Sequence, residues 1–165
     1  MTTKKDEAAQ YELSITRVFN APRALVWKAW TDAEHAKHWA GPRSFTATHL
    51  NHDIRPGGKW SGCLHRDPEP GNDQPVLDLW QGGEYLEVVE PERLVFTFHW
   101  DNRGGLPTPE TTITVIFEER DGKTTMHFHQ AFFETIEDRD GHNGGWNSSF
   151  DRLVDHLDGV LSSAN

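Results

Sequence analysis

Histidine and cysteine residues at alternate positions are the first candidates for chemistry in this sequence. Cys63 and His65 lie two residues apart in one segment with the pattern of a strand, and His127 and His129 do so in another. Because successive side chains of a strand point to opposite faces, the members of each pair share a face. If the two strands were neighbours, the pairs together could hold a zinc ion, which takes nitrogen and sulfur ligands. The close ligand spacings of common zinc motifs are absent, so we predict no metal site and no cofactor.

General acid–base catalysis needs a titratable group held in an apolar pocket. The candidates on or beside expected strands are His52, Asp53, His65, Glu84, His99 and His129. Of these, His65 or His129 could reach an internal cavity and polarise a ligand oxygen, as a cyclase or hydratase requires. No Ser-His-Asp or Cys-His pattern has a supporting context, and no glycine-rich phosphate loop is present. The sequence therefore identifies no catalytic residue and favours a protein that is not an enzyme.

The aromatic residues indicate a binding site more strongly than the titratable residues do. The chain contains seven Trp and nine Phe, although its mean hydropathy is −0.71. Rigid aromatic walls with a few polar tips suit a flat apolar ligand. The residues predicted to line such a cavity are Trp39, Phe45, Trp60, His65, Trp80, Phe98, Trp100, His129, Trp146 and Phe150. The alternative is that these rings fill the interior themselves as ordinary core.

Length, charge and composition exclude several classes of protein. A chain of 165 residues fits one domain, predicted over 11–162 after a disordered tail at 1–10. A net charge of −10 without Lys or Arg clusters argues against nucleic acid. No apolar run could cross a bilayer, and the first residues lack the apolar core of a signal peptide. Because the single cysteine cannot form an internal disulfide, we predict a cytoplasmic protein.

The elements expected to position these residues begin with a strand over 12–19. A helix follows from Pro22, and a second short helix is opened by Thr31 and Asp32, in keeping with the preference of proline and capping residues for helix starts. Alternating apolar residues and turn signals then predict strands over 46–54, 59–65, 79–89, 94–100, 111–118 and 124–132. Paired glycines at 82 and 83 inside a strand indicate a bulge or a close approach of backbones.

A long amphipathic helix is predicted from Gly144 to Leu161, after a loose polar segment over 134–143. Its apolar stripe consists of Trp146, Phe150, Leu153, Leu157 and Val160 or Leu161. Such a stripe must be buried against the strands, whose short connections favour an antiparallel sheet. We predict an α+β fold, in which a curved antiparallel sheet wraps around the long C-terminal helix, two short helices follow the first strand, and a cavity remains inside.

Several segments occur in an order that is typical of a known family. They are TRVFNAPRALVWKAWTD, HWAGP, DIRPGGKW, GGEYLEVVEPERLVFTFHW, TTITVIFEE and GGWNSSFDRLVDHL. In these segments the chain resembles the activator of heat-shock-protein-90 ATPase homologue-like (AHSA) family of the SRPBCC, or START-like, superfamily. The resemblance implies the helix-grip fold and an internal pocket for an apolar ligand.

Three functions remain open at this point. The favoured one is binding of a small apolar or aromatic molecule between the sheet and the C-terminal helix. The alternatives are a cyclase- or hydratase-type enzyme that uses the same cavity, and a co-chaperone-like protein that stimulates the ATPase of a heat-shock chaperone, as the family name implies. No nucleic acid or membrane partner is expected, and the protein is expected to be a monomer or a weak homodimer.

Overall fold

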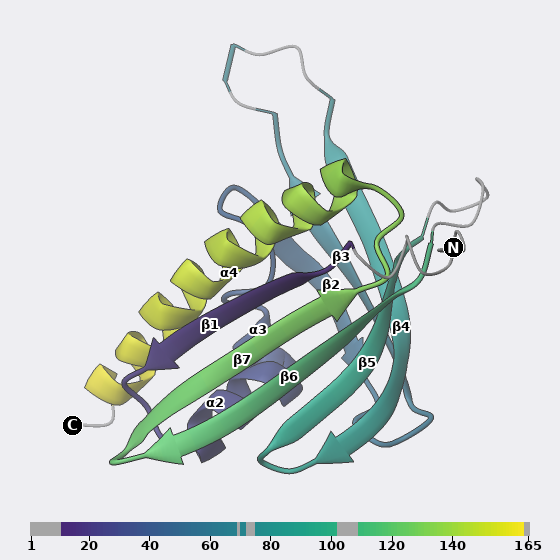
Figure 1. Cartoon of the computed structure of the whole chain (residues 1–165). Coiled ribbons are helices and arrows are strands. Elements are labelled where there is room, and N and C mark those ends of the chain that lie inside the picture. Colours follow the sequence, from purple (N-terminus) through teal and green to yellow (C-terminus); the bar gives the residue numbers. More distant parts are fainter. Residues whose placement is uncertain (1–10, 69, 72–74, 102–108, 164–165) are drawn as a thin grey trace, which may run out of the picture.

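The computed structural model describes residues 11–68, 70–71, 75–101 and 109–163. The elements in chain order are β1 (Leu13–Phe19), α2 (Arg23–Thr31), α3 (Ala33–Ala36), β2 (Thr46–His52), β3 (Lys59–Arg66), β4 (Leu77–Val89), β5 (Arg93–Trp100), β6 (Thr111–Arg120), β7 (Lys123–Ala131) and α4 (Ile136–Ser163). The predicted order of strand, two short helices, further strands and long helix is confirmed (Figure 1). The predicted tail at 1–10 lies outside the described residues.

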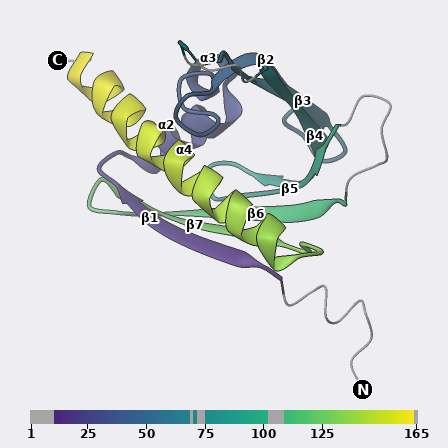
Figure 2. The same cartoon turned by 90° about the horizontal axis from the view of Figure 1, so that it is seen from above.

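The strands form one seven-stranded sheet in the order β1-β7-β6-β5-β4-β3-β2. Every neighbouring pair is antiparallel. The sheet curls strongly from β1 round to β2, and α4, α2 and α3 lie inside the curl (Figure 2). This is the predicted helix-grip arrangement. None of the helices in the described residues is long and apolar enough to span a bilayer.

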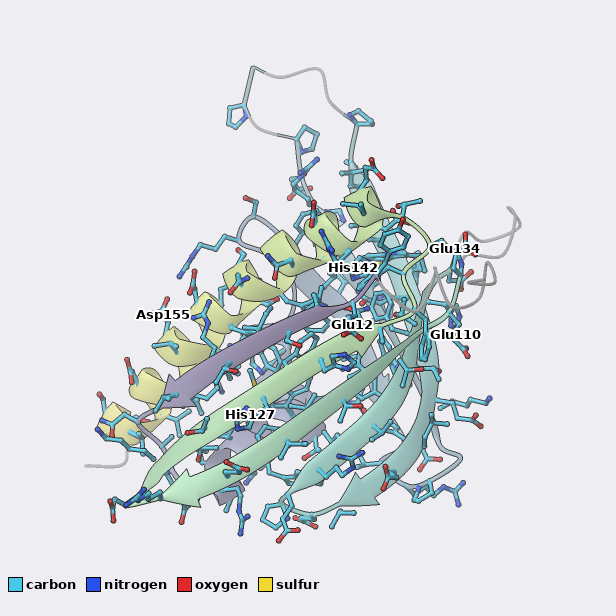
Figure 3. The ribbon with its side chains drawn as sticks, viewed as in Figure 1. Glu12, Glu110, His127, Glu134, His142 and Asp155 are labelled. Carbon is cyan, nitrogen blue, oxygen red and sulfur yellow. The ribbon has the colours of Figure 1, made fainter. Side chains whose placement is uncertain are left out.

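Alternation along the strands determines which side chains face the helix. In β6 the odd positions are buried and the even ones are half-buried from Thr111 to Phe117. In β7, Met126 and Phe128 are buried, which turns His127 and His129 to the outer face (Figure 3). Because β4, β5 and β6 separate β3 from β7, the cysteine–histidine pair and the histidine pair do not come together. The strand contact on which a zinc site would depend is therefore not formed.

The long helix begins eight residues before its predicted start, at Ile136 instead of Gly144. The segment 134–143, predicted to be loose, is largely helical. The Asp138 N–H donates to the hydroxyl of Thr135 at 3.1 Å, which caps the first turn. Glu137 and Asp138 in that turn also complement the helix dipole. These interactions offset part of the low helix propensity of the glycines inside α4, about 1 kcal/mol each relative to alanine. Burial of Phe150, Leu153 and Leu157 stabilises the helix further.

Candidate functional site

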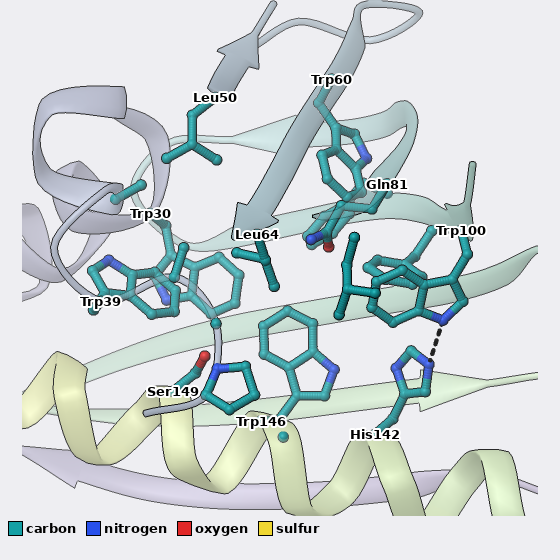
Figure 4. A pocket seen from close by; sticks show the side chains of 18 of the residues that line it. Trp30, Trp39, Leu50, Trp60, Leu64, Gln81, Trp100, His142, Trp146 and Ser149 are labelled. Atoms are coloured by element: carbon teal, nitrogen blue, oxygen red, sulfur yellow. Dashed lines mark hydrogen bonds between the residues drawn. The ribbon is translucent and has the colours of Figure 1, made fainter. Parts of the chain in front are cut away.

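A cavity of about 410 Å³ lies between the concave face of the sheet and α4 (Figure 4). Strands β2 to β5 form one wall, and the first half of α4 forms the other. Trp30 of α2, Ala36 of α3 and the segment 39–42 contribute the rest. Most of the lining side chains are aromatic or aliphatic, so the space is an apolar one with few polar groups, as is typical of ligand pockets.

Five of the ten residues predicted to line a cavity do so. They are Trp39, Trp60, Phe98, Trp100 and Trp146. They come from three strand or loop segments and from α4, and the curl of the sheet brings them together. Trp60 and Phe98 have ring centroids 5.7 Å apart, and Phe98 and Trp100 have centroids 5.0 Å apart. The structure thus gathers these aromatic side chains into one wall.

The two predicted histidines lie away from the cavity, because both occupy outward positions on their strands. His65 is held between Asp78 (Nδ1 to Oδ1, 2.7 Å) and Asp67 (Nε2 to Oδ1, 2.9 Å) on the outer face. The hydrogen bond to Asp78 has the larger effect and that to Asp67 the smaller, and both raise the pKa of the His65 imidazole, which lies at the surface. His129 is 3.0 Å from Glu12 on the outer face. Neither imidazole is placed to polarise a ligand oxygen inside.

Phe45, Trp80 and Phe150 are also absent from the cavity wall. Trp80 points outward because Leu79 and Gln81 take the inner positions of β4, and its ring lies against His49. Phe45 contacts the Arg66 guanidinium, 5.1 Å from its ring centroid. Phe150 is completely buried beneath the wall and packs against Trp146 and Trp30. Phe150 therefore belongs to the core, in agreement with the alternative that such rings fill the interior themselves.

The sequence reasoning missed several residues that do line the cavity. They are Trp30, His52, Gln81, Tyr85, Glu137, Asp138 and His142. His52 had been considered only as an acid–base candidate. Asp138 and His142 precede Trp146 by eight and four residues, which places all three on one helix face. That spacing would have identified them if the helix had been extended to its capping residue.

The indole N–H groups of four lining tryptophans are bound within the protein. Their acceptors are the Ala29 carbonyl for Trp39 (2.9 Å), the Thr97 carbonyl for Trp60 (2.9 Å), His142 Nε2 for Trp100 (3.2 Å) and Gln130 Oε1 for Trp146 (2.8 Å). The Trp30 indole nitrogen has no partner among the described residues. These hydrogen bonds fix the orientations of the rings, so the wall is formed before any ligand arrives.

Gly83 provides the space in which Trp60 makes its hydrogen bond. A Cβ atom at this position would clash with the Thr97 carbonyl and would lie 2.6 Å from the Trp60 indole nitrogen. The predicted close approach at the paired glycines is therefore confirmed. A register shift also follows it, between Tyr85 and Glu87.

Burial controls the charge of the titratable groups on the wall. It lowers the pKa of His142 to about 4, against the opposing charge of Asp138. Burial also lowers the pKa of His52, against a hydrogen bond with the Thr31 backbone. The pKa of Tyr85 is raised by burial. At neutral pH these three side chains are uncharged, so the wall around them offers apolar contact with neutral polar tips. The acidic lining residues are Glu137 and Asp138 in the first turn of α4.

Arg152 ties the segment after α3 to α4 at the border of the cavity. Its Nη1 donates to the carbonyls of Ala40 (3.1 Å), Gly41 (2.8 Å), Pro42 (3.2 Å) and Phe45 (3.1 Å), and its Nη2 donates to that of His38 (3.3 Å). Burial and the nearby Arg43 lower the pKa of Arg152. The guanidinium thereby holds the segment that carries Trp39 in place.

Comparisons with known proteins agree with this architecture. The model of a family described as activator of Hsp90 ATPase homolog 1-like protein matches residues 20–158. A crystal structure from Chromobacterium violaceum is 22% identical, with 88% of this chain and 96% of that one covered and a TM-score of 0.74. An AHSA1 protein from Silicibacter pomeroyi is 20% identical, with 93% and 99% covered and a TM-score of 0.74. A solution structure from Arthrobacter aurescens is 24% identical, with 93% and 88% covered and a TM-score of 0.74. No curated protein matches the chain.

Proposed function

The chain belongs to the activator of Hsp90 ATPase homolog 1-like family, and we propose that it binds a small apolar or aromatic molecule in the cavity between its sheet and α4. The observation that carries this proposal is the space of about 410 Å³ walled by tryptophan rings, four of which have their N–H groups bound within the protein. Preformed apolar cavities of this size are typical of small-molecule sites. A cytoplasmic location and a monomeric or weakly dimeric state are parts of the same proposal.

Binding can be tested by calorimetric titration with 2-naphthylmethanol, a flat and uncharged probe. Gly141 and Gly144 provide a matched pair of variants, because both lie in α4 and an added Cβ meets no atom within 4 Å at either position. Only Gly141 lines the cavity. We expect Gly141→Phe to weaken binding at least about tenfold, equivalent to about 1.4 kcal/mol, and Gly144→Phe to leave it unchanged. Equal affinities of both variants, or no binding to the unmodified protein, would contradict the proposal.

An enzymatic use of the same cavity is the second candidate. It is favoured by the two imidazoles on the wall, His52 and His142, which burial keeps neutral by lowering their pKa values. The Nδ1 of His52 has no hydrogen-bond partner among the described residues, so this imidazole is the candidate base. The test is NMR observation of phenol and ketone probes during long incubation with the protein. Conversion that is lost in His52→Phe or His142→Phe would establish it, and unchanged spectra of bound probes would eliminate it.

A co-chaperone role is suggested by the family description, which names an activator of the Hsp90 ATPase. The test is the ATPase rate of the chaperone with and without this chain. Stimulation that persists in Gly141→Phe would separate this role from ligand binding, and no stimulation would eliminate it.

A further inference from the structure

The formal charges on the cavity wall are all negative. Among the described lining residues only Glu137 and Asp138 carry acidic side chains, and no Lys or Arg is present. The chain as a whole has a net charge of −10. The electrostatic potential at the entrance therefore attracts cations and repels anions.

Both carboxylates lie in the first turn of α4 and line the cavity together with Trp100. Asp138 precedes His142 by one helical turn, and its charge acts on that imidazole. His142 Nε2 accepts the Trp100 indole N–H at 3.2 Å (Figure 4). A group bound beside Trp100 thus lies close to Asp138 and against an aromatic face. This combination of carboxylates and aromatic faces is suited to a substituted ammonium ion.

A carboxylate ligand would find few donors in the same place. The N–H groups of Trp39, Trp60, Trp100 and Trp146 are already bound by acceptors of the protein. The start of α4 carries a partial positive charge of about half a unit, which the two full negative charges of its first turn exceed. The backbone N–H of Asp138 is also already used, because it donates to the Thr135 hydroxyl oxygen.

We propose that the ligand is an aromatic amine: its flat body lies between the tryptophan rings, and its ammonium group lies at the start of α4 beside Glu137, Asp138 and the face of Trp100. This inference rests on the proposed binding function and adds the charge of the ligand to it. An anionic molecule of the same shape is selected against by the same two carboxylates.

Three probes of one shape test the charge directly: 2-naphthylmethylammonium, 2-naphthylmethanol and 2-naphthoate. An exposed ion pair contributes up to about fivefold in affinity, and Glu137 and Asp138 are both exposed. We expect the ammonium to bind about tenfold more tightly than the alcohol, and the carboxylate to bind more weakly than both. Salt at about 1 M reduces the Debye length to about 3 Å, so it is expected to remove most of the advantage of the ammonium.

The variant Glu137→Gln/Asp138→Asn is expected to bind the ammonium and the alcohol within about threefold of each other, because the exposed charge pairs are lost. The matched control is Glu110→Gln/Glu134→Gln, which changes the net charge equally. Both control carboxylates are exposed and absent from the cavity wall. They lie near the end of the sheet at which α4 begins (Figure 3). The control is expected to keep the preference for the ammonium. Circular dichroism checks that both variants retain the helix.

The outcomes separate this inference from the function on which it rests. If none of the three probes binds, the proposed function itself fails. If the alcohol and the carboxylate bind as tightly as the ammonium, the cavity binds ligands but the inference on charge is overturned. It is also overturned if the two double variants lower the affinity for the ammonium equally, because the effect then comes from the net charge of the protein.

Discussion

Gln130 connects the cavity wall to the sheet through two buried hydrogen bonds, which makes it the most informative residue to change. Its side chain is completely buried. Its Oε1 accepts the Trp146 indole N–H at 2.8 Å, and its Nε2 donates to the Thr111 hydroxyl at 2.9 Å. That hydroxyl donates in turn to the Phe98 carbonyl at 3.3 Å. The network therefore joins a lining residue of α4 to β7, β6 and β5.

The variant Gln130→Leu removes both hydrogen bonds and leaves the Trp146 N–H without an acceptor. Each lost bond costs about 1 kcal/mol, and a buried donor without a partner costs about 1–3 kcal/mol. Leucine recovers part of this through apolar burial. We therefore expect the free energy of unfolding to fall by about 2–4 kcal/mol, measured by urea denaturation followed by circular dichroism.

A double-mutant cycle with Trp146→Phe isolates the interaction between the two side chains. Once the indole N–H is absent, Gln130→Leu no longer orphans a donor, so its cost should fall by about 1–2 kcal/mol. Thr125→Val, at an outward position of the same strand β7, is the control and should change stability by about 0.5 kcal/mol or less. Costs that add within about 0.5 kcal/mol would refute the reasoning, because distant and independent sites behave in that way.

Three further predictions concern Arg152 at the border of the cavity, His142 on its wall, and the two glycines Gly83 and Gly144. Arg152→Lys, which cannot reach five carbonyls at once, should lower stability by about 1–3 kcal/mol and speed amide exchange over 38–45; unchanged exchange would contradict it. Because the pKa of His142 is lowered to about 4, its neutral form stabilises the fold above pH 6.5, and up to about 3 kcal/mol is lost as the pH falls towards 4; this loss should be smaller in His142→Phe, and equal pH profiles would contradict it. Gly83→Ala should destabilise by about 1–3 kcal/mol through the clash with the Thr97 carbonyl, whereas Gly144→Ala in α4 should stabilise by up to about 1 kcal/mol; thermal unfolding compares the two, and equal shifts would contradict both.

The fold could be predicted because its local signals agree with one another. Alternation of apolar and polar residues identified β6 and β7, and in the structure this alternation places His127 on the outer face. The start of α4 was misplaced because the polar segment 134–143 was interpreted as loose and the paired glycines at 144 and 145 were taken as the opening of the helix. The Thr135–Asp138 spacing, an N-terminal capping signal, was overlooked.

The site could be predicted only in part, because it depends on which side chains of each strand point inward and on the curvature of the sheet. In β4, Leu79 and Trp80 are both apolar, so alternation alone does not show which of them faces inward. The structure places Leu79 inside and Trp80 outside. His52 and Tyr85 meet in one cavity only because the sheet curls. No local pattern in the sequence encodes that curvature.

The cavity exists because α4 presents small residues to it. Gly141, Gly145 and Ser149 recur at intervals of four, which places them on one face of the helix, and all three line the cavity. An added Cβ at Gly141 meets no atom within 4 Å, and at Gly145 it makes only an ordinary contact with Pro42 at 3.6 Å. Larger side chains would have room there and would raise helix propensity by about 1 kcal/mol each over glycine. Glycines that lower the helix propensity of α4 thus keep its inner face open, whereas the buried Phe150 and Leu153 that follow hold the second half of α4 against the core.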